Sequence, residues 1–300
     1  MSPIFLRPIT KTLIWGTEQW GISAHSNGDD EICGGEFDGK TLSWLWRERP
    51  ALFGMDAASQ AAFPLLTKII DAKSDLSIQV HPDDDYAARN ENGSYGKTEC
   101  WYIMDAAPGA TIVIGHNAKN SGEVREMIEG RRWSDFIREI PVHGGDFFFI
   151  EPGTVHAIKG GTVILETQQS SDITYRVYDY DRLQDGKPRP LHVKQSIDVI
   201  KAPFEQKDPP LDGKKTLGDS SGTAVRQLVS CPLFTVWHAS VSGTLEVQQT
   251  RPFLLCSVIR GSCTLDGVPS ALEVGTHLIL PAGFGSARFA GNAELIFSSI

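Results

Sequence analysis

The sequence has no apolar run that approaches the length of a bilayer-spanning helix. Its first residues, MSPIFLRPITK, lack the long apolar core of a signal peptide, so we expect a soluble, cytoplasmic protein with no membrane partner. Positive charge is also scarce, since 28 lysines and arginines stand against 37 aspartates and glutamates, which gives a net charge of -9 at pH 7. This balance argues against a nucleic-acid partner, although a local group of basic side chains can still bind a single phosphate.

Cysteines are few and follow no metal-binding spacing. They are odd in number, lie far apart and stand mostly in apolar, strand-like stretches without a C-x-x-C pair. We therefore expect buried free thiols rather than a disulfide framework or a zinc knuckle. A catalytic cysteine is disfavoured as well, because no histidine lies in a partnering motif. The five positions are Cys33, Cys100, Cys231, Cys256 and Cys263.

Short apolar stretches separated by turn residues make up most of the chain and predict a mainly β protein. A length of 300 residues accommodates two domains. The stretch from Lys201 to Gly222 is rich in Pro, Gly, Ser, Lys and Asp, without sustained apolar periodicity, which is typical of a linker. We predict an N-terminal domain over residues 1–205, a linker over 206–222 and a C-terminal β domain over 223–300.

Two regions have helical rather than strand-like character. Ser43 can cap a short helix, and Phe63 to Ile70 supplies an apolar stripe that continues this helical section. Between Ser121 and Ile140, apolar side chains recur at a spacing near 3.6 residues. This second region predicts a helical insertion in the N-terminal domain, at about residues 117–140.

Polar side chains that suit a metal or a substrate begin in the stretch LSIQVHP. Ser77, Gln79 and His81 alternate there with apolar residues, so they share one face of a half-buried strand that ends at Pro82. After a turn-rich excursion, a second strand begins at KTECWY and carries Lys97 and Glu99 on one face. His81 and Glu99 are therefore expected to meet on facing strands.

A third candidate ligand follows in GGDFFFIEPGTVHAIKGG, where an apolar strand breaks at a Pro-Gly turn and His156 enters the next strand. Each residue alone is more often structural than functional, since such residue types are common in any chain. Together, two imidazoles and one carboxylate form a facial metal-ligand set that leaves positions open for substrate. Gln79 is a candidate fourth, oxygen donor.

One further charged residue, Glu166, lies in a stretch that we expect to form a buried strand. Glu166 follows the apolar residues of TVILETQQ, where a carboxylate is costly to bury without a partner. Arg176, in the next strand, is the natural candidate for that partner. Such a pair can be structural or functional when it is taken in isolation.

The order of features in GGDFFFIEPGTVHAIKGG is a glycine, an apolar strand, a Pro-Gly turn and then a histidine. This order resembles the cupin superfamily. The stretches LSIQVHP, KTECWY, FFFIEPGTVHAI and ETQQSSDITYRVYDYDR, with IWG near the start, resemble the short bacterial form of the type I phosphomannose isomerases over nearly the whole chain. The resemblance implies two cupin-type (jelly-roll) β-barrels, the second without metal, and interconversion of mannose 6-phosphate and fructose 6-phosphate with one Zn²⁺ per chain. The longer family members carry K-P-E where this chain has K-T-E, and a larger helical domain that is absent here.

The resemblance also implies roles for individual residues. Its metal ligands match Gln79, His81, Glu99 and His156, and its substrate and catalytic positions match Ser77, Lys97, Glu166 and Arg176. An aldose-ketose isomerase moves a proton through an enediol, whose negative charge Arg176 would stabilise. Lys97 and Glu166 remain alternative candidates for the base.

Two other functions fit part of the same pattern. Two histidines and one carboxylate also suit the Fe(II) of a cupin oxygenase. A non-catalytic sugar-binding cupin would keep the metal for structure, although it has little need of an acid-base group beside that metal. The expected partner is a small sugar phosphate, and the chain itself is either a monomer or a homodimer.

Overall fold

The computed structural model describes residues 1–55, 62–212, 217–221 and 224–300. The chain is mainly β, as predicted, and forms two compact units. The central unit comprises residues 11–18 and 69–208, and the terminal unit comprises residues 1–10, 19–68 and 209–300. The chain passes from one unit to the other within strands β2 (Ile9–Leu13), β3 (Gly16–Ile22) and β7 (Leu65–Ala72), and between residues 208 and 209.

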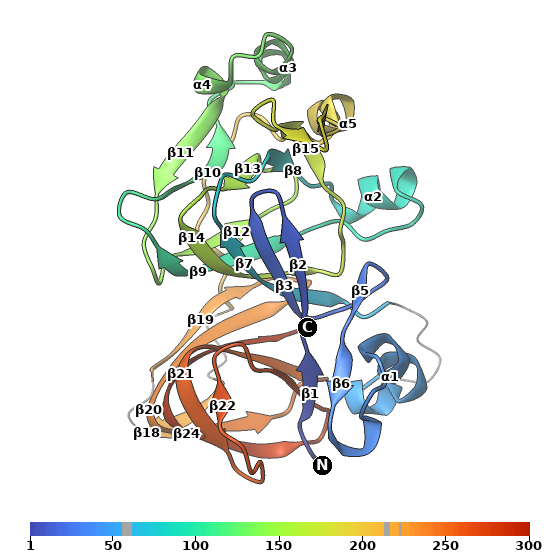
Figure 1. Ribbon diagram of the computed structural model, residues 1–300, viewed down its shortest axis with the longest axis vertical. Helices are drawn as coiled ribbons and strands as arrows, with labels where there is room; N and C mark the ends of the chain where they lie inside the picture. Colours follow the sequence, from blue (N-terminus) through green and yellow to red (C-terminus); the bar gives the residue numbers. More distant parts are fainter. Residues whose placement is uncertain (56–61, 213–216, 222–223) are drawn as a thin grey trace. The chain divides into compact units, whose positions relative to one another are not determined.

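Two sheets contribute to the central unit (Figure 1). The five-stranded sheet has the order β11 (Ile137–Pro141), β10 (Thr111–His116), β13 (His156–Ile158), β8 (Ile78–Val80), β15 (Tyr175–Tyr178). The six-stranded sheet has the order β12 (Phe147–Ile150), β9 (Glu99–Ala106), β14 (Thr162–Gln169), β7, β3, β2.

The five-stranded sheet is packed on both faces, because alternate residues of its strands enter different apolar clusters. Ile112 and Ile158 pack in one cluster with Trp101 and Ile164 of the six-stranded sheet. Val113 and its neighbours pack in a second cluster with side chains of the helices. The alternation of a β-strand therefore joins the two sheets on one side and the helices on the other.

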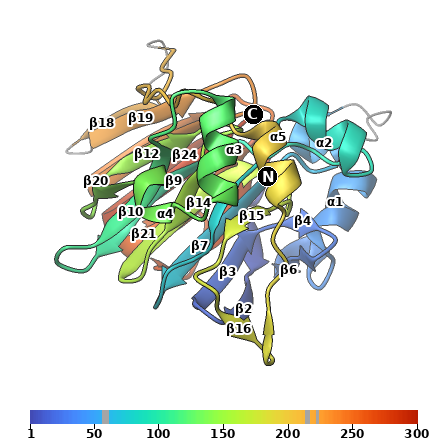
Figure 2. The ribbon, with the colours of Figure 1, turned by 90° about the horizontal axis from the view of Figure 1, so that it is seen from above.

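Helices cover the outer face of the five-stranded sheet. α5 (Val193–Val199) packs against β15 and β8, and α3 (Ser121–Glu129) packs against α4 (Trp133–Phe136) and α5 (Figure 1 and Figure 2). Asn120 caps α3 by accepting a hydrogen bond from the backbone N–H of Glu123. In the described residues, none of the helices is both long enough and apolar enough to cross a bilayer.

The predicted helix through Ile140 is wrong in its last part. Residues Ile137–Pro141 form β11, in which Ile140 pairs with Ile112 of β10. A short apolar stretch fits both the helical spacing near 3.6 residues and the strand spacing of two residues. Here the residues form a strand because they pair with the edge of β10. The helical insertion itself is present as α3 and α4.

The helical prediction for Phe63 to Ile70 is also wrong, because Leu65–Ala72 forms β7. This strand is buried along most of its length, so it has no alternation of apolar and polar residues that would reveal it. The short helix before it, α1 (Leu42–Glu48), is capped by Thr41 rather than Ser43. The backbone N–H and hydroxyl of Ser43 instead donate to the carboxylate of Asp29.

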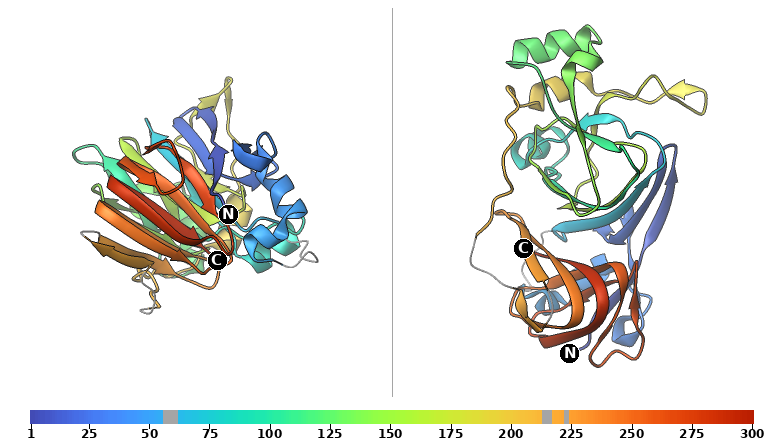
Figure 3. Two further views of the ribbon diagram at one scale, coloured as in Figure 1. Left: turned by 90° about the horizontal axis from the view of Figure 1, so that it is seen from below. Right: turned by 90° about the vertical axis from the view of Figure 1, so that its left-hand side faces the viewer.

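The terminal unit is built on a nine-stranded antiparallel sheet that contains the first and the last strand of the chain. Its long strands β20, β21 and β24 lie side by side, in orange to red in Figure 3. β1 pairs with β23 on one side and with β6 on the other. The nine strands are β1 (Ile4–Arg7), β6 (Glu31–Cys33), β18 (Gly218–Ser221), β19 (Ala224–Ser230), β20 (Thr235–Gln249), β21 (Leu254–Leu265), β22 (Leu272–Glu273), β23 (His277–Leu280) and β24 (Gly285–Ser299).

The remaining elements are short. They are the hairpin β4 (Ala24–His25) and β5 (Gly28–Asp29), the 3-10 turns η1 (Gly35–Phe37) and η2 (Pro50–Phe53), the helix α2 (Asp84–Asn90), and the hairpin β16 (Leu183–Gln184) and β17 (Lys187–Pro188). Residues 213–216 and 222 of the predicted linker lie outside the described residues, and β18 lies within the same stretch. The domain boundaries at 205 and 222 therefore stay a prediction. All five cysteines are free, and Cys100, Cys256 and Cys263 are buried.

Candidate active site

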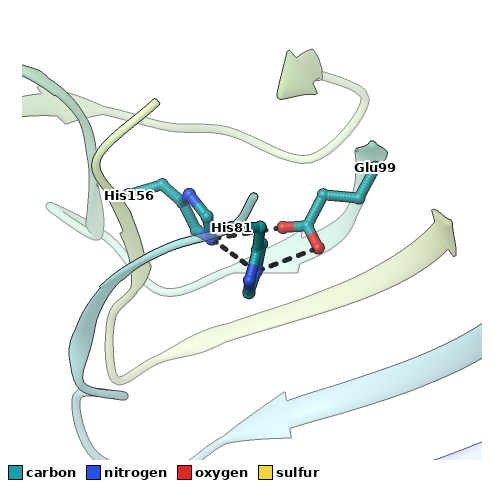
Figure 4. A group of neighbouring side chains, drawn as sticks. All are labelled: His81, Glu99 and His156. Carbon is teal, nitrogen blue, oxygen red and sulfur yellow. Dashed lines mark hydrogen bonds and ion pairs between the residues drawn. The ribbon is translucent and has the colours of Figure 1, made fainter. Parts of the chain in front are cut away.

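Three side chains of the metal-ligand prediction converge in the central unit. His81 directly follows β8, Glu99 begins β9 and His156 begins β13. Figure 4 shows their polar ends pointing toward one another. The two imidazole Nε2 atoms lie 3.1 Å apart, and the Glu99 oxygens lie 3.3 Å from Nε2 of His156 and 3.4 Å from Nε2 of His81. Each side chain is at most 1% exposed.

The environment of His156 selects the form of imidazole that binds a cation. Its Nδ1 lies 2.9 Å from the carbonyl oxygen of Thr154, so the neutral ring donates Nδ1–H to that oxygen and keeps a lone pair on Nε2. Burial, which the charge of Lys97 reinforces, lowers the pKa of His156 to about 4. The ring is therefore neutral at physiological pH, as a metal ligand must be.

Lys97 and Glu166 lie beside this group. The Lys97 Nζ atom is 2.8 Å from Glu99 Oε2, 3.0 Å from His81 Nε2 and 3.9 Å from Glu166 Oε1. Burial alone would lower the pKa of Lys97, but the carboxylates of Glu99 and Glu166 outweigh it and raise that pKa above its ordinary value. The lysine is therefore an ammonium ion within this arrangement of side chains.

The charges of the buried group fit a divalent cation. Glu99 and Glu166 contribute two carboxylates and Lys97 contributes one ammonium, whereas neither the neutral His156 nor a His81 in the neutral form that binds metals contributes charge. An excess of buried negative charge is costly unless it is compensated. The donor atoms of His81, Glu99 and His156 all lie within 4.8 Å of one another, and imidazole nitrogen and carboxylate oxygen are usual ligands of Zn²⁺ and Fe²⁺.

Strand register brings Glu166 to the same place. Glu166 of β14 lies directly opposite Trp101 of β9, and the Trp101 indole Nε1–H donates to Glu166 Oε2 over 3.1 Å. The predicted partner, Arg176, donates instead to the carbonyl oxygen of Pro190 over 2.8 Å. The partners seen for Glu166 are Trp101 and Lys97, and a pairing of Glu166 with Arg176 stays a prediction.

Gln79 and Arg176 share a face with the candidate ligand His156. Gln79 is the middle residue of β8 and lies opposite His156 of β13 on one side and Arg176 of β15 on the other. Directly opposed residues in antiparallel strands project to the same face of a sheet. Both side chains are half-buried, and Ser77, two residues before Gln79, is buried.

The segment that carries Lys97 is fixed by hydrogen bonds that the sequence does not reveal. The side chain of Gln169 accepts from the backbone N–H of Thr98 over 2.8 Å and donates to Asp84 Oδ1 over 2.9 Å. Asp84 Oδ1 also accepts from the backbone N–H of Gly96 over 2.7 Å. Both residues next to Lys97 are thus tied to the start of α2 and the end of β14.

Two other residues of this site have no motif that would have revealed them. Trp101 is fully buried, and Gln168 of β14 is buried opposite Glu99. The Gln168 amide donates to the carbonyl oxygens of Gln169 and Ser171, over 2.8 and 2.6 Å. For Trp101 the only signal in the sequence was its position. It lies two residues after Glu99, so its side chain projects from the same side of β9.

Comparison with known proteins shows which family this chain belongs to. Residues 10–109 match the profile described as "Phosphomannose isomerase type I, catalytic domain", and residues 224–300 match "Mannose-6-phosphate isomerase, cupin domain". The mannose-6-phosphate isomerase of Streptococcus mutans is 44% identical over 317 residues, covering 99% of this chain and 98% of the relative. This chain belongs to the type I phosphomannose isomerase family.

Further relatives of this type I phosphomannose isomerase agree in sequence and in structure. The mannose-6-phosphate isomerase ManA of Bacillus subtilis is 42% identical over 100% of this chain and 99% of its own length. A crystal structure of the mannose 6-phosphate isomerase from Bacillus subtilis covers 100% of both chains with a TM-score of 0.94 and 40% identity. The putative mannosephosphate isomerase of Archaeoglobus fulgidus, at 19% identity, shares the fold with a TM-score of 0.73 over 99% of this chain and 97% of its own.

Proposed function

We propose that this protein is a zinc-dependent mannose-6-phosphate isomerase, which interconverts mannose 6-phosphate and fructose 6-phosphate. The observation that carries the proposal is the convergence of His81, Glu99 and His156 in a chain of the type I phosphomannose isomerase family. Membership of the family supports the substrate. The buried donor group supports a metal.

His81, Glu99 and His156 would hold the cation, with Gln79 as a fourth donor from the same face of the sheet. Catalytic zinc keeps a position open for substrate and can accept a fifth ligand, so these four donors would still admit a substrate oxygen. When bound, the cation supplies Lewis acidity to the oxygen atoms of the open-chain sugar. The same donors also suit Fe²⁺.

Isomerisation of the open-chain aldose moves one proton from C2 to C1 and one from O2 to O1. We assign the transfer of the carbon-bound proton to Glu166. Its carboxylate accepts the proton from C2 and returns it to C1. Trp101 holds one oxygen of this carboxylate, while the other lies on the side of Lys97. Lys97, whose Nζ is already engaged by Glu99 at 2.8 Å, stabilises negative charge on the enediol oxygens rather than acting as the base.

Arg176 and Ser77 are assigned to the substrate. Arg176 lies opposite Gln79 on the face that carries His156, and its guanidinium is half-buried, so its charge is only partly screened by water. We expect it to stabilise the anionic intermediate. Ser77 directly precedes β8, two residues before Gln79, and offers a hydroxyl for a sugar oxygen.

The test measures turnover of mannose 6-phosphate in D₂O. A coupled assay measures the formation of fructose 6-phosphate, and NMR measures the deuterium in the product. We expect fructose 6-phosphate with deuterium from solvent at C1, because Glu166 exchanges its proton with water during part of the turnovers. Oxygen uptake by iron-loaded protein without isomerisation would support an oxygenase instead. Binding of the sugar phosphate with no turnover and no exchange would support a non-catalytic cupin, and either result would overturn the proposal.

A further inference from the structure

Trp101 is a fully buried aromatic residue that contacts two members of the candidate site. It lies on β9 two residues after Glu99, and strand alternation turns both side chains to the same face. Its ring belongs to the apolar cluster between the two sheets of the central unit. Ordinary core packing explains the burial of the ring but leaves its two polar neighbours unexplained.

The first contact fixes the carboxylate of Glu166. The indole Nε1–H donates to Glu166 Oε2 over 3.1 Å, and the strands place the two residues directly opposite each other. An indole nitrogen can only donate, and a buried hydrogen bond to a charged oxygen is stronger than one between neutral groups. One oxygen of Glu166 is therefore anchored, which leaves Oε1 on the side of Lys97, at 3.9 Å from its Nζ.

The second contact is with His156. The ring of Trp101 lies edge-on to the imidazole, with centroids 5.4 Å apart and planes at 76°. On its Nδ1 side the same imidazole is held by the carbonyl oxygen of Thr154. The tryptophan thus supports the plane in which His156 presents Nε2 to the metal-ligand group.

We propose that Trp101 is a positioning residue of the isomerase reaction, which orients Glu166 for proton transfer through its indole N–H. The proposal rests on the proposed function, because it concerns the residue to which the carbon-bound proton is assigned. Phenylalanine at this position would retain an aromatic ring beside His156 but would lack the donor. The consequence is that turnover, rather than metal binding, should depend on the indole nitrogen.

The test compares Trp101→Phe with Trp15→Phe in the zinc-loaded protein. Trp15 is a matched control, since it is a buried tryptophan of the same apolar cluster. For Trp101→Phe we expect kcat to fall at least about tenfold, the order expected for a lost hydrogen bond to a charged group, while KM and zinc content change less than about twofold. Trp15→Phe should leave kcat close to that of the parent protein.

A double-mutant cycle separates positioning from general loss of structure. If Trp101 acts through Glu166, Trp101→Phe should cause no further fall in kcat when it is added to Glu166→Gln. An equal fall in both backgrounds, or parent-like kcat in Trp101→Phe, would overturn the proposal. Trp101→Leu also lacks the donor and serves as the second variant if Trp101→Phe does not fold.

The two proposals fail in distinguishable ways. If the parent protein does not isomerise mannose 6-phosphate, or if Glu166→Gln retains full turnover, the proposed function or its assignment of the proton is wrong. If Glu166→Gln is impaired while Trp101→Phe is not, the assignment to Glu166 stands and the role of Trp101 is wrong. Thermal unfolding of each variant is measured in parallel, so that loss of folded protein is not counted as loss of turnover.

Discussion

Glu99 is the side chain on which most contacts of the candidate site depend, because it lies against both imidazoles and against Lys97. Glu99→Gln preserves its shape and removes its charge. We expect loss of stoichiometric zinc and of turnover, together with destabilisation of about 3–5 kcal/mol, since one partner of a buried ion pair is removed. Zinc analysis and urea unfolding measure the two effects.

The control for this prediction is Glu129→Gln, which breaks an ion pair with Arg125 in which both side chains are 57% exposed. Exposed pairs contribute little, so its unfolding free energy should change by less than about 0.5 kcal/mol. Full zinc occupancy in Glu99→Gln would contradict the assignment of Glu99 as a ligand.

Arg176 is predicted to act on the reaction rather than on the metal. Its guanidinium donates to the carbonyl oxygen of Pro190, and Arg176 is not one of the three residues of the candidate metal-ligand group. Arg176→Ala should therefore reduce kcat by a larger factor than it reduces zinc content, because charge on the intermediate loses a stabilising cation. Turnover and zinc are measured in the same samples. Loss of zinc with normal turnover per bound metal is the result that would refute this role.

His277 should make the stability of the terminal unit depend on pH. Its ring is buried, with Nδ1 at 2.8 Å from the Ser257 hydroxyl, and burial lowers its pKa to about 4. Because the folded-state pKa lies below that of an exposed histidine, the unfolded chain binds more protons at acid pH. Folding should lose up to about 3 kcal/mol through this group as the pH falls from about 6.5 to about 4.

Unfolding free energies across that pH range test the expectation. His277→Gln should show a weaker loss of stability on acidification than the parent protein, whereas His143→Gln, at a side chain that is 82% exposed, should follow the parent curve. An unchanged pH dependence in His277→Gln would show that other groups are responsible.

At the scale of elements, the start of α2 holds the segment that carries Lys97. Asp84 Oδ1 accepts hydrogen bonds from Gly96 and from Gln169. Asp84→Ala should lower stability by about 1–3 kcal/mol for the two lost bonds and should reduce kcat with zinc retained. Asp85→Ala is the matched control, since Asp85 is the next residue in the same first turn of α2. Equal effects of the two substitutions would contradict this account.

Elements that bear a motif were predictable from the sequence. Alternation around Gln79 and His81 gave the short strand β8, and the Pro-Gly turn placed His156 at a strand start. The apolar runs of β7 and of β11 were misassigned, since a short or fully buried strand carries no period of two residues. The hydrogen bond from Trp101 to Glu166 was not predictable, because it depends on the register between β9 and β14.

At the scale of the whole chain, sequence similarity identifies the family, whereas long-range pairing determines the units. β1 belongs to the terminal unit because Ile4 pairs with Ile279 of β23, a contact that no local pattern encodes. The three candidate ligands lie in separate parts of the chain, yet all belong to the central unit. Motifs that name residue types were therefore sufficient to predict that these three side chains come together, and insufficient to predict the contacts that orient them.

The most direct test of the central claim is a zinc titration of metal-free protein, with bound zinc and turnover of mannose 6-phosphate measured in each sample. Because His81, Glu99 and His156 form one group of donors, turnover should rise in proportion to bound zinc and reach its maximum at one ion per chain. Full turnover in metal-free protein, or one bound zinc per chain without turnover, would contradict the account.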